Sequence, residues 1–344
     1  MAYTTIKNPG LYFNTKLYTG NGSTQTITGV GFQPDFMWIK ERSGTSSHAL
    51  INAVSGINKK LMSNSTDVES TETNYITAVS NDGFSVGQNN GINQSGITNV
   101  AWNWKAGTGQ GSSNTDGSIN TTYTSVNTTA GFSISKYVGT GSNATVGHGL
   151  GVAPKVVITK NLDTADNWTV YHESLGNTKG AFLNLTNTPG TSSAYWNNTT
   201  PTSSVFSVGT EVPMNKSGDN IIAYCFAEKQ GYSKFGSYVG TNSGANGPFI
   251  YTGFKPAFIL IKNTTSSADW HIRDNKRDTY NASTHFLKPN SSDAEVTSGE
   301  AIDILSNGFK IKANGLKVQD SGNTYIYMAF AAAPLVGDNP ETAR

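Results

Sequence analysis

The sequence holds little charge, few histidines and a single cysteine, and each scarcity excludes a class of protein. Only 14% of its 344 residues are charged, and 24 Lys and Arg against 23 Asp and Glu leave a net charge of +1. This balance argues against nucleic-acid or anionic-membrane binding driven by overall charge. Because Cys225 has no second cysteine to pair with, packing and hydrogen bonds must hold the fold.

Long apolar runs are also absent. The longest, such as Phe258 to Ile261 and Met328 to Ala333, have the length of a strand and fall far below the roughly 20 residues of a membrane span. The N-terminus has no basic start followed by an apolar stretch, so it does not read as a signal peptide. We therefore expect a protein that is made in the cytoplasm, is not secreted and does not insert into a membrane.

The sequence is rich in glycine and polar turn residues. It has 37 glycines and only 36% hydrophobic residues, a mixture typical of short strands joined by many turns. A chain of 344 residues exceeds the usual size of one domain, so two or three domains are expected.

One set of landmarks recurs three times along the chain. Each copy opens with a tyrosine and a glycine turn, reaches a proline 16 to 18 residues later and a lysine six residues after that. The prolines are Pro34, Pro154 and Pro256, and the lysines are Lys40, Lys160 and Lys262. An aromatic strand closes each copy, and spacings of 18 residues place Trp102, Tyr224 and Tyr327 at one position.

These landmarks predict an all-β protein of three tandem antiparallel β-sandwiches, jelly-roll-like in character. The first unit spans residues 1–107, the second spans 108–230 and begins with a Gly/Ser-rich linker, and the third spans 231–344 with a C-terminal tail. A small helix is expected near residues 54–62.

The sequence offers no set of catalytic or metal-binding residues. The five histidines show no pair at helical metal-binding spacing, and no Gly-x-Ser-x-Gly motif is present. Cys225 lies within a strand, where a buried, inert thiol is the usual outcome. We therefore expect no enzyme, no cofactor and no metal site.

Two stretches combine flat rings with planar hydrogen-bonding groups, as sugar-binding sites do. They are residues 166–173 and 269–278, and the candidate glycan-binding residues are Trp168, Tyr171, His172, Trp270, His271, Arg273 and Asp274. A competing interpretation is that Trp168 and Trp270, which share one position in the repeat, pack in the core. His48 takes that position in the first unit.

Other charged landmarks have simpler interpretations. Residues 274–278 are expected to form a solvated turn with compensating charges. Lys40, Lys160 and Lys262 are expected to charge the margin of a strand and discourage edge pairing.

Four motifs resemble a repeat domain of tailed phages. They are Tyr18-Thr-Gly-Asn-Gly-Ser, the run from Gly31 to Lys40, the run from Val100 to Gly107, and Gly147-His-Gly-Leu-Gly-Val-Ala-Pro154. The sequence is similar, over roughly residues 11–335, to a β-sandwich family carried by tail-fibre and other virion proteins of phages that infect marine bacteria. The resemblance supplies no catalytic residues.

This resemblance implies a virion protein with two alternative roles. The first is a tail-fibre or appendage component that recognises a host-surface polysaccharide. The second is a head decoration or tail ornament with a purely structural role, which the absence of an obvious shaft favours. Expected partners are other virion proteins of the tail or capsid and further copies of the chain, with a trimer favoured by analogy with fibres. An enzyme that degrades surface polysaccharide is the least favoured alternative.

Overall fold

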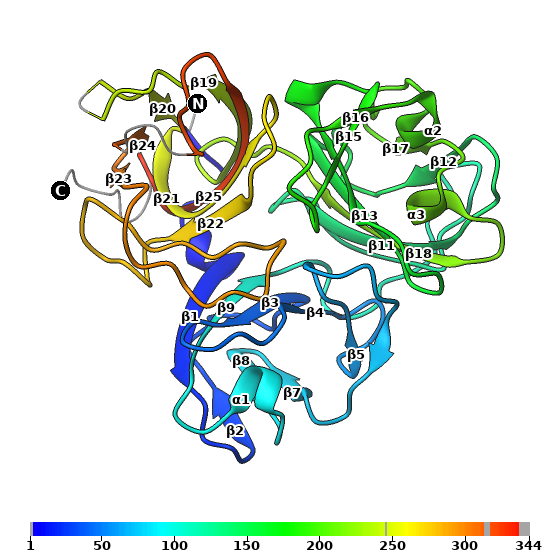
Figure 1. The fold of residues 1–344 in the computed structure, drawn as a ribbon. Coiled ribbons are helices and arrows are strands. Elements are labelled where there is room, and N and C mark those ends of the chain that lie inside the picture. Colours follow the sequence, from blue (N-terminus) through cyan, green and yellow to red (C-terminus); the bar gives the residue numbers. More distant parts are fainter. Residues whose placement is uncertain (1–2, 245, 313–316, 337–344) are drawn as a thin grey trace.

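The computed structural model describes residues 3–244, 246–312 and 317–336. Strands hold 41% of the residues and helices 5%, and the sheets are antiparallel, which confirms the predicted all-β fold. Figure 1 shows three lobes around a common centre: the first unit in blue to cyan, the second in green and the third in yellow to red.

The first unit is a sandwich of a four-stranded sheet, in the order β1-β9-β3-β4, and a three-stranded sheet, β2-β8-β7. A two-stranded ribbon, β5-β6, and two short helices complete it. The elements are η1 (Pro9–Leu11), β1 (Phe13–Thr19), β2 (Gln25–Ile27), β3 (Phe36–Glu41), β4 (Ala49–Asn52), β5 (Lys59–Lys60), β6 (Ser70–Thr71), β7 (Ile76–Ser80), β8 (Gly83–Val86), α1 (Asn90–Asn93) and β9 (Thr98–Trp104). Residues 54–62 form turns and β5, so the helix expected there is wrong.

The second unit has a seven-stranded sheet, β10-β11-β18-β13-β14-β15-β16, and a two-stranded sheet, β12-β17. The elements are β10 (Tyr123–Asn127), β11 (Phe132–Val138), β12 (Ala144–Gly147), β13 (Val156–Asn161), β14 (Thr169–His172), η2 (Glu173–Leu175), β15 (Lys179–Phe182), β16 (Gly190–Thr191), α2 (Ser193–Trp196), β17 (Val205–Val208), α3 (Val212–Asn215) and β18 (Asn220–Phe226).

The third unit has a four-stranded sheet, β19-β25-β21-β22, and a three-stranded sheet, β20-β24-β23. The elements are β19 (Ser233–Val239), β20 (Phe249–Tyr251), β21 (Phe254–Asn263), β22 (Trp270–Asp274), β23 (Ile302–Leu305), β24 (Gly308–Ile311) and β25 (Thr324–Pro334). The first described residues lie beside this unit, where the Tyr3 hydroxyl donates to the Gly253 carbonyl at 2.8 Å.

The main sheets of the three units share one strand order, seen in β1-β9-β3-β4, β11-β18-β13-β14 and β19-β25-β21-β22. Their registers identify equivalent residues. Trp38 pairs with Trp102, Ile158 with Tyr224 and Leu260 with Met328. Met328 therefore takes the position that the 18-residue spacing assigned to Tyr327. Because side chains alternate along a strand, Tyr327 lies on the opposite face and packs against Phe309, with ring centroids 5.4 Å apart.

The linker that opens the second unit is held by the first unit. The Asp35 carboxylate accepts hydrogen bonds from the backbone N–H groups of Ala106, Thr108 and Gly109 at 2.7 to 3.1 Å. A β-bridge then joins Ser112 to Thr124. The Gly/Ser composition thus provides tight turns here, and the chain is fixed by the carboxylate.

One face of each main sheet packs against its own small sheet, and the opposite faces of the three sheets meet in a shared core. The apolar clusters within the first and second sandwiches are separate from the cluster that spans all three units. At its centre the equivalent rings of Trp104, Phe226 and Phe330 contact one another, with centroids 5.6 to 6.5 Å apart. Such aromatic clusters bury large apolar area, so this core joins the units strongly.

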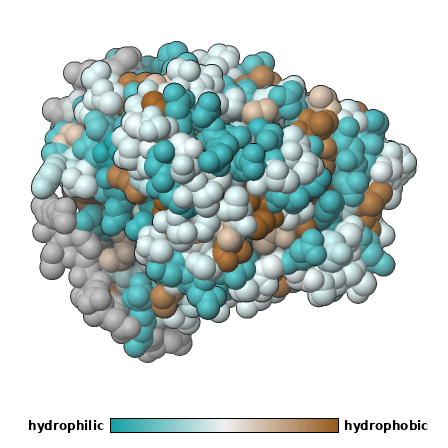
Figure 2. Space-filling model, turned by 90° about the horizontal axis from the view of Figure 1, so that it is seen from below, coloured by the Kyte–Doolittle hydropathy of each residue, from teal (hydrophilic) through white to brown (hydrophobic). Residues whose placement is uncertain are grey.

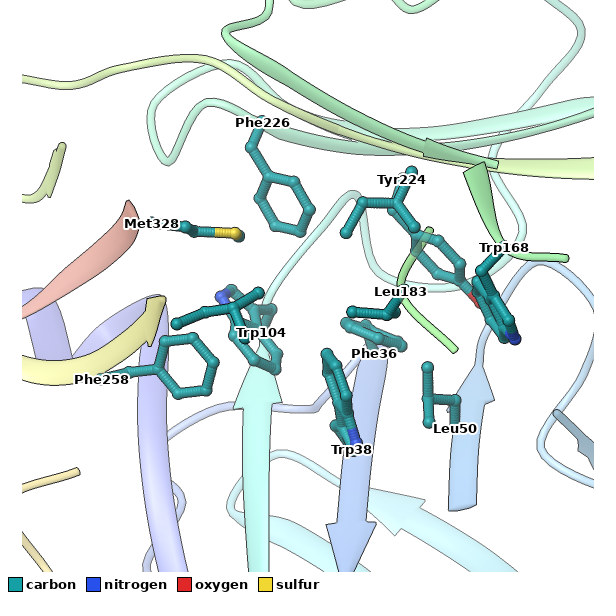
Figure 3. A pocket seen from close by; sticks show the side chains of 12 residues that line it. Phe36, Trp38, Leu50, Trp104, Trp168, Leu183, Tyr224, Phe226, Phe258 and Met328 are labelled. Carbon is teal, nitrogen blue, oxygen red and sulfur yellow. The ribbon is translucent and has the colours of Figure 1, made fainter. Parts of the chain in front are cut away.

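A void of about 10 Å³ remains in this shared core, room for about one water molecule. Figure 3 shows rings from different units around it, among them Trp38, Tyr224 and Phe258. Its lining is aromatic and aliphatic, so the void reflects imperfect packing and offers no space for an organic ligand.

Candidate functional site

The seven residues expected to bind glycan are all buried. None of Trp168, Tyr171, His172, Trp270, His271, Arg273 and Asp274 has more than 3% of its surface exposed. Their ring faces and polar groups contact other side chains and carbonyls of the protein. The glycan-binding prediction is therefore wrong at these positions, and the alternative of core packing describes them.

The shared position of the two tryptophans joins each unit to its neighbour. Trp168 Nε1 donates to the Met62 carbonyl of the first unit at 2.9 Å, and Trp270 Nε1 donates to the Phe182 carbonyl of the second at 2.8 Å. His48 Nε2 lies 2.9 Å from the Lys288 carbonyl of the third unit. The three contacts link the units in a closed ring.

The recurrent lysines are also buried, so the prediction that they charge a strand margin is wrong. Lys160 Nζ donates to the Thr66 carbonyl of the first unit at 3.1 Å, and Lys262 Nζ donates to the Thr186 carbonyl of the second at 2.7 Å. Lys40 Nζ binds carbonyls of its own unit, Glu41 and Gly44. Burial lowers the pKa of each lysine to about 8.

A second shared position lies 18 residues after each proline. The side chain at this position forms a hydrogen bond to another unit, but the residue type and its partner differ among the three units. Asn52 Nδ2 donates to the Tyr224 hydroxyl at 3.1 Å, and His172 Nε2 lies 3.1 Å from the Tyr327 carbonyl. In the third unit Asp274 Oδ2 accepts from Trp102 Nε1 at 3.0 Å. Burial lowers the pKa of His172 to about 4.

Asp274 also begins a buried network of charges. Arg277 bonds Asp274 at 2.5 Å and Glu295 at 2.7 Å, and Glu295 accepts from Arg42 of the first unit at 2.8 Å. Burial opposes ionisation of Asp274, but Arg277 outweighs it and keeps the pKa of this carboxyl below its usual value. The solvated turn expected at residues 274–278 is therefore wrong for Asp274 and Arg277, which lie in the contact between the first and third units.

Just after Asp274 the third unit departs from the other two. Eleven positions separate Leu50 from its bridge partner Leu61, and eleven separate Val170 from its partner Ala181. Between the corresponding Ile272 and Leu287 there are fifteen. The four additional residues enlarge a surface loop, and insertions of this kind on a rigid scaffold are common places for binding sites.

This loop borders a cavity of about 520 Å³, which we call the loop cleft. Its lining residues are Lys255, Asn275, Lys276, Asp278, Thr279, Tyr280, Asn281 and Ile304. Tyr280 is 78% exposed, the most exposed of the large apolar and aromatic side chains in the described part of the chain. The cleft has the size of a small-molecule or oligosaccharide site.

The loop cleft is fixed by hydrogen bonds beneath it. The Asn281 side chain donates to the Ile304 carbonyl at 2.9 Å and accepts from the Ile304 N–H at 2.8 Å, which ties the loop to β23. The Asp278 carboxylate accepts from the Thr284 N–H at 2.7 Å. The exposed ring of Tyr280 is thus presented from an anchored loop.

The chemistry of the loop cleft suits binding. An exposed tyrosine ring can cover the apolar face of a sugar, while amide, carboxylate and ammonium groups bond its hydroxyls. Among the described residues, Asp278 is the one carboxylate in the lining, and this part of the chain does not supply the pair of carboxyl groups that glycosidases use. Among the described residues, no group of three or more His, Cys, Asp and Glu is placed to hold a metal ion.

Sequence reasoning missed Tyr280 and Asn281, although a signal was present. The interval from proline to the later phenylalanine is longest in the third unit, at 53 residues, and a run of charged residues begins at Asp274. Taken together, the longer interval and the charges mark an enlarged polar loop.

A family model described as a domain of unknown function, DUF7483, matches residues 8–334. No curated protein matches the chain. In the described part of the chain, no helix is long and apolar enough to span a membrane.

Proposed function

The chain belongs to the DUF7483 family, and we propose that it is a phage virion protein that recognises a host-surface glycan through the loop cleft. In this proposal the protein is a tail-fibre or appendage component that acts by binding and catalyses no reaction. Its partners are other virion proteins and the polysaccharide of the host.

The loop cleft is the observation that carries the proposal. It combines a cavity of about 520 Å³, a polar lining and the exposed ring of Tyr280. It also lies where the third unit differs from the other two, on a loop anchored to β23. Elements that the three units share, which we call the repeated frame, hold the fold, whereas a loop that is enlarged in one unit can bind a ligand.

The similarity of the sequence to repeat sandwiches of tailed phages supports the location in a virion. Assembly as a homotrimer, by analogy with fibres, would present three loop clefts to one cell. Several weak contacts would then combine into firm attachment, provided that the clefts reach the surface together.

A glycan array tests this proposal, with the wild-type protein and the Tyr280→Ala variant side by side. We expect at least one class of glycan to be retained by the wild type and to lose roughly tenfold or more of its binding in the variant, since the ring contact is removed. Tyr251→Ala is the matched control, because Tyr251 is an exposed tyrosine (54%) on β20, outside the loop cleft. Equal retention by the wild type and by Tyr280→Ala would reject the loop cleft as the binding site.

One feature favours the alternative, a head decoration or tail ornament with a structural role. Phe249 and Tyr251 are exposed on the edge strand β20, at outward positions. The registers place Phe249 where the first two units carry Thr26 and Thr145. Exposed aromatic side chains on a sheet edge suit contact with another subunit. Figure 2 shows that apolar residues on the face it displays are scattered in small patches.

Antibody labelling of intact particles separates these two functions. Labelling at the tail tip, viewed by electron microscopy, supports host recognition. Labelling over the whole head supports decoration, and in that case Phe249→Ser would be expected to reduce incorporation into particles.

A further inference from the structure

We propose that the glycan is acidic, and that its carboxylate or sulfate groups bind Lys16 and Lys276 in a groove beside the loop cleft. This inference rests on the proposed function and names the chemical class of the ligand. It follows from the position and the charge of these two lysines.

The groove runs along β1, the edge strand of the main sheet of the first unit, and has a volume of about 330 Å³. Its lining residues are Asn14, Thr15, Lys16, Leu17, Gly29 and Lys276. Lys276 comes from the loop of the third unit and lines both the groove and the loop cleft. The two cavities are therefore neighbours, and a polymer that fills one can extend into the other.

Neither Lys16 nor Lys276 has a carboxylate within ion-pair distance among the described residues. Other surface lysines do, such as Lys60, whose Nζ lies 3.1 Å from Glu72, and Lys288, whose Nζ lies 3.2 Å from Asp293. Two ammonium groups without partners in one groove repel each other and attract an anion. An acidic group of a ligand would relieve this repulsion.

The acidic residue that interacts with Lys16 is Asp82, but its carboxylate is already engaged. It accepts hydrogen bonds from the N–H groups of Gly29 at 2.9 Å and Gly31 at 2.8 Å. These bonds lower the pKa of Asp82. Asp82 thus fixes the turn next to the groove, and its carboxylate lies beyond ion-pair distance of the Lys16 ammonium, which can still take an anionic group of a ligand.

The two cavities differ in charge. Among the described residues, the loop cleft is lined by Asp278 together with Lys255 and Lys276, whereas the groove is lined by Lys16 and Lys276 with no carboxylate, so an acidic group is favoured most in the groove and a neutral sugar is tolerated next to Tyr280. A polysaccharide that alternates or mixes neutral and acidic sugars satisfies both cavities. Because the net charge of the protein is only +1, such binding would depend on this local pair and not on overall charge.

Three polymers of matched length test this inference: polygalacturonate, dextran sulfate and unmodified dextran. Binding to the full chain is measured by titration calorimetry at physiological ionic strength, where non-specific attraction is largely screened. We expect binding of at least one acidic polymer and at least tenfold weaker binding of dextran. Preference between the two acidic polymers identifies the carboxylate or the sulfate as the recognised group.

Variants assign the effect to the groove. Lys16→Gln and Lys276→Gln are each expected to weaken acidic-polymer binding roughly fivefold, the upper range for a partly exposed ion pair. Lys179→Gln, which removes an exposed lysine of β15 in the second unit, is the matched control and should leave binding unchanged. Unchanged melting temperatures would show that each variant is folded.

The outcomes separate this inference from the proposed function. If dextran binds as tightly as the acidic polymers, or if the lysine variants bind them like the wild type, the acidic ligand is rejected, and the loop cleft stands as long as Tyr280→Ala loses glycan binding. If the lysine variants lose binding and Tyr280→Ala does not, the groove is supported and the loop cleft is rejected. If none of the three polymers binds, the acidic ligand is rejected as well.

Discussion

Two equivalent segments of the molecule differ in length. One follows β14 in the second unit, and the other follows β22 in the third. His172 and Asp274 occupy equivalent positions, and both bond another unit from a buried site. After His172 the chain makes one turn, η2, and returns as β15. After Asp274 it takes four more residues and forms the loop cleft.

This difference separates two uses of one repeated frame. At two positions that all three units share, those of Trp168 and of His172, each unit contacts another unit, and the polar side chains at these positions are buried. The loop after β22, which is longer in the third unit than its counterparts in the other two, is polar and anchored, and Tyr280 within it is exposed. We infer that the enlarged loop of the third unit binds the ligand, whereas the positions shared by the three units stabilise the fold.

The largest expected loss of stability comes from removing the buried carboxylate of Asp274. Asp274→Ala leaves Arg277 in the contact between units without this partner, and removing one member of a buried ion pair costs about 3–5 kcal/mol. Urea unfolding at pH 7 measures this loss. Because the pKa of Asp274 is lowered, its stabilisation is present above the usual pKa of a carboxyl and is lost as the pH falls below it. A loss under 1 kcal/mol at pH 7 would show that the charge network does not hold the units together.

The second-largest effect concerns His172, whose contribution to stability is lost in a different pH range from that of Asp274. The Ser174 N–H donates to His172 Nδ1, so the neutral ring donates from Nε2 to the Tyr327 carbonyl. Its pKa of about 4 lies below the unfolded value of about 6.5, so stability is present above pH 6.5 and falls between pH 6.5 and pH 4, by up to about 3 kcal/mol.

His172→Gln should therefore make the free energy of unfolding less dependent on pH in this range. Other buried histidines, including His48, keep part of the dependence in the variant. Unfolding curves at pH 7 and pH 5 for the wild type and the variant give the comparison. Equal pH dependence in the two proteins would contradict the assignment.

A smaller loss of stability is expected in the first unit, where the uncharged Asn52 takes the position of His172 and Asp274. Tyr224→Phe removes the hydroxyl that accepts from Asn52 and should cost about 1 kcal/mol, the net contribution of one hydrogen bond. The cost should be the same at pH 5 and pH 7, because neither Asn52 nor Tyr224 changes charge in this range. A cost as large as that of Asp274→Ala would remove the distinction between charged and neutral contacts.

The smallest effect on stability is expected in the loop cleft. Tyr280 is exposed, so Tyr280→Ala should change the free energy of unfolding by no more than about 0.5 kcal/mol while it weakens glycan binding. Thermal melts of this variant and of Tyr251→Ala provide the measurement. A strong destabilisation by Tyr280→Ala would assign the ring to the frame.

The sequence was sufficient to predict the strands and their antiparallel class. The proline-to-lysine runs are buried strands, as their apolar pattern indicates, and β3 and β13 lie where this pattern placed them. The register of β25 was less accessible, because one additional residue moved Met328 into the place expected for Tyr327. Spacing alone does not reveal a shift of one residue, which changes the face on which a side chain lies.

The candidate site was harder to predict, since burial depends on packing between units far apart in sequence. The residues around Trp168 have the composition of a sugar-binding stretch. In the structure, however, Trp168 Nε1 donates to a carbonyl more than 100 residues away in the sequence. The same holds for Arg277, whose charged neighbours suggested solvent and whose partner Glu295 completes a buried network. In this chain, residues that recur in all three units predict buried contacts of the repeated frame. Residues outside the repeat are better predictors of an exposed site.

Hydrogen–deuterium exchange with and without polygalacturonate tests the division between frame and site most directly. We expect slow exchange of β9, β18 and β25 in the free protein, because these strands surround one shared core. We expect the added polymer to protect amides near Tyr280 and along β1 and to leave β14 and β22 unchanged. New protection confined to β14 and β22, around Trp168 and Trp270, would contradict this division.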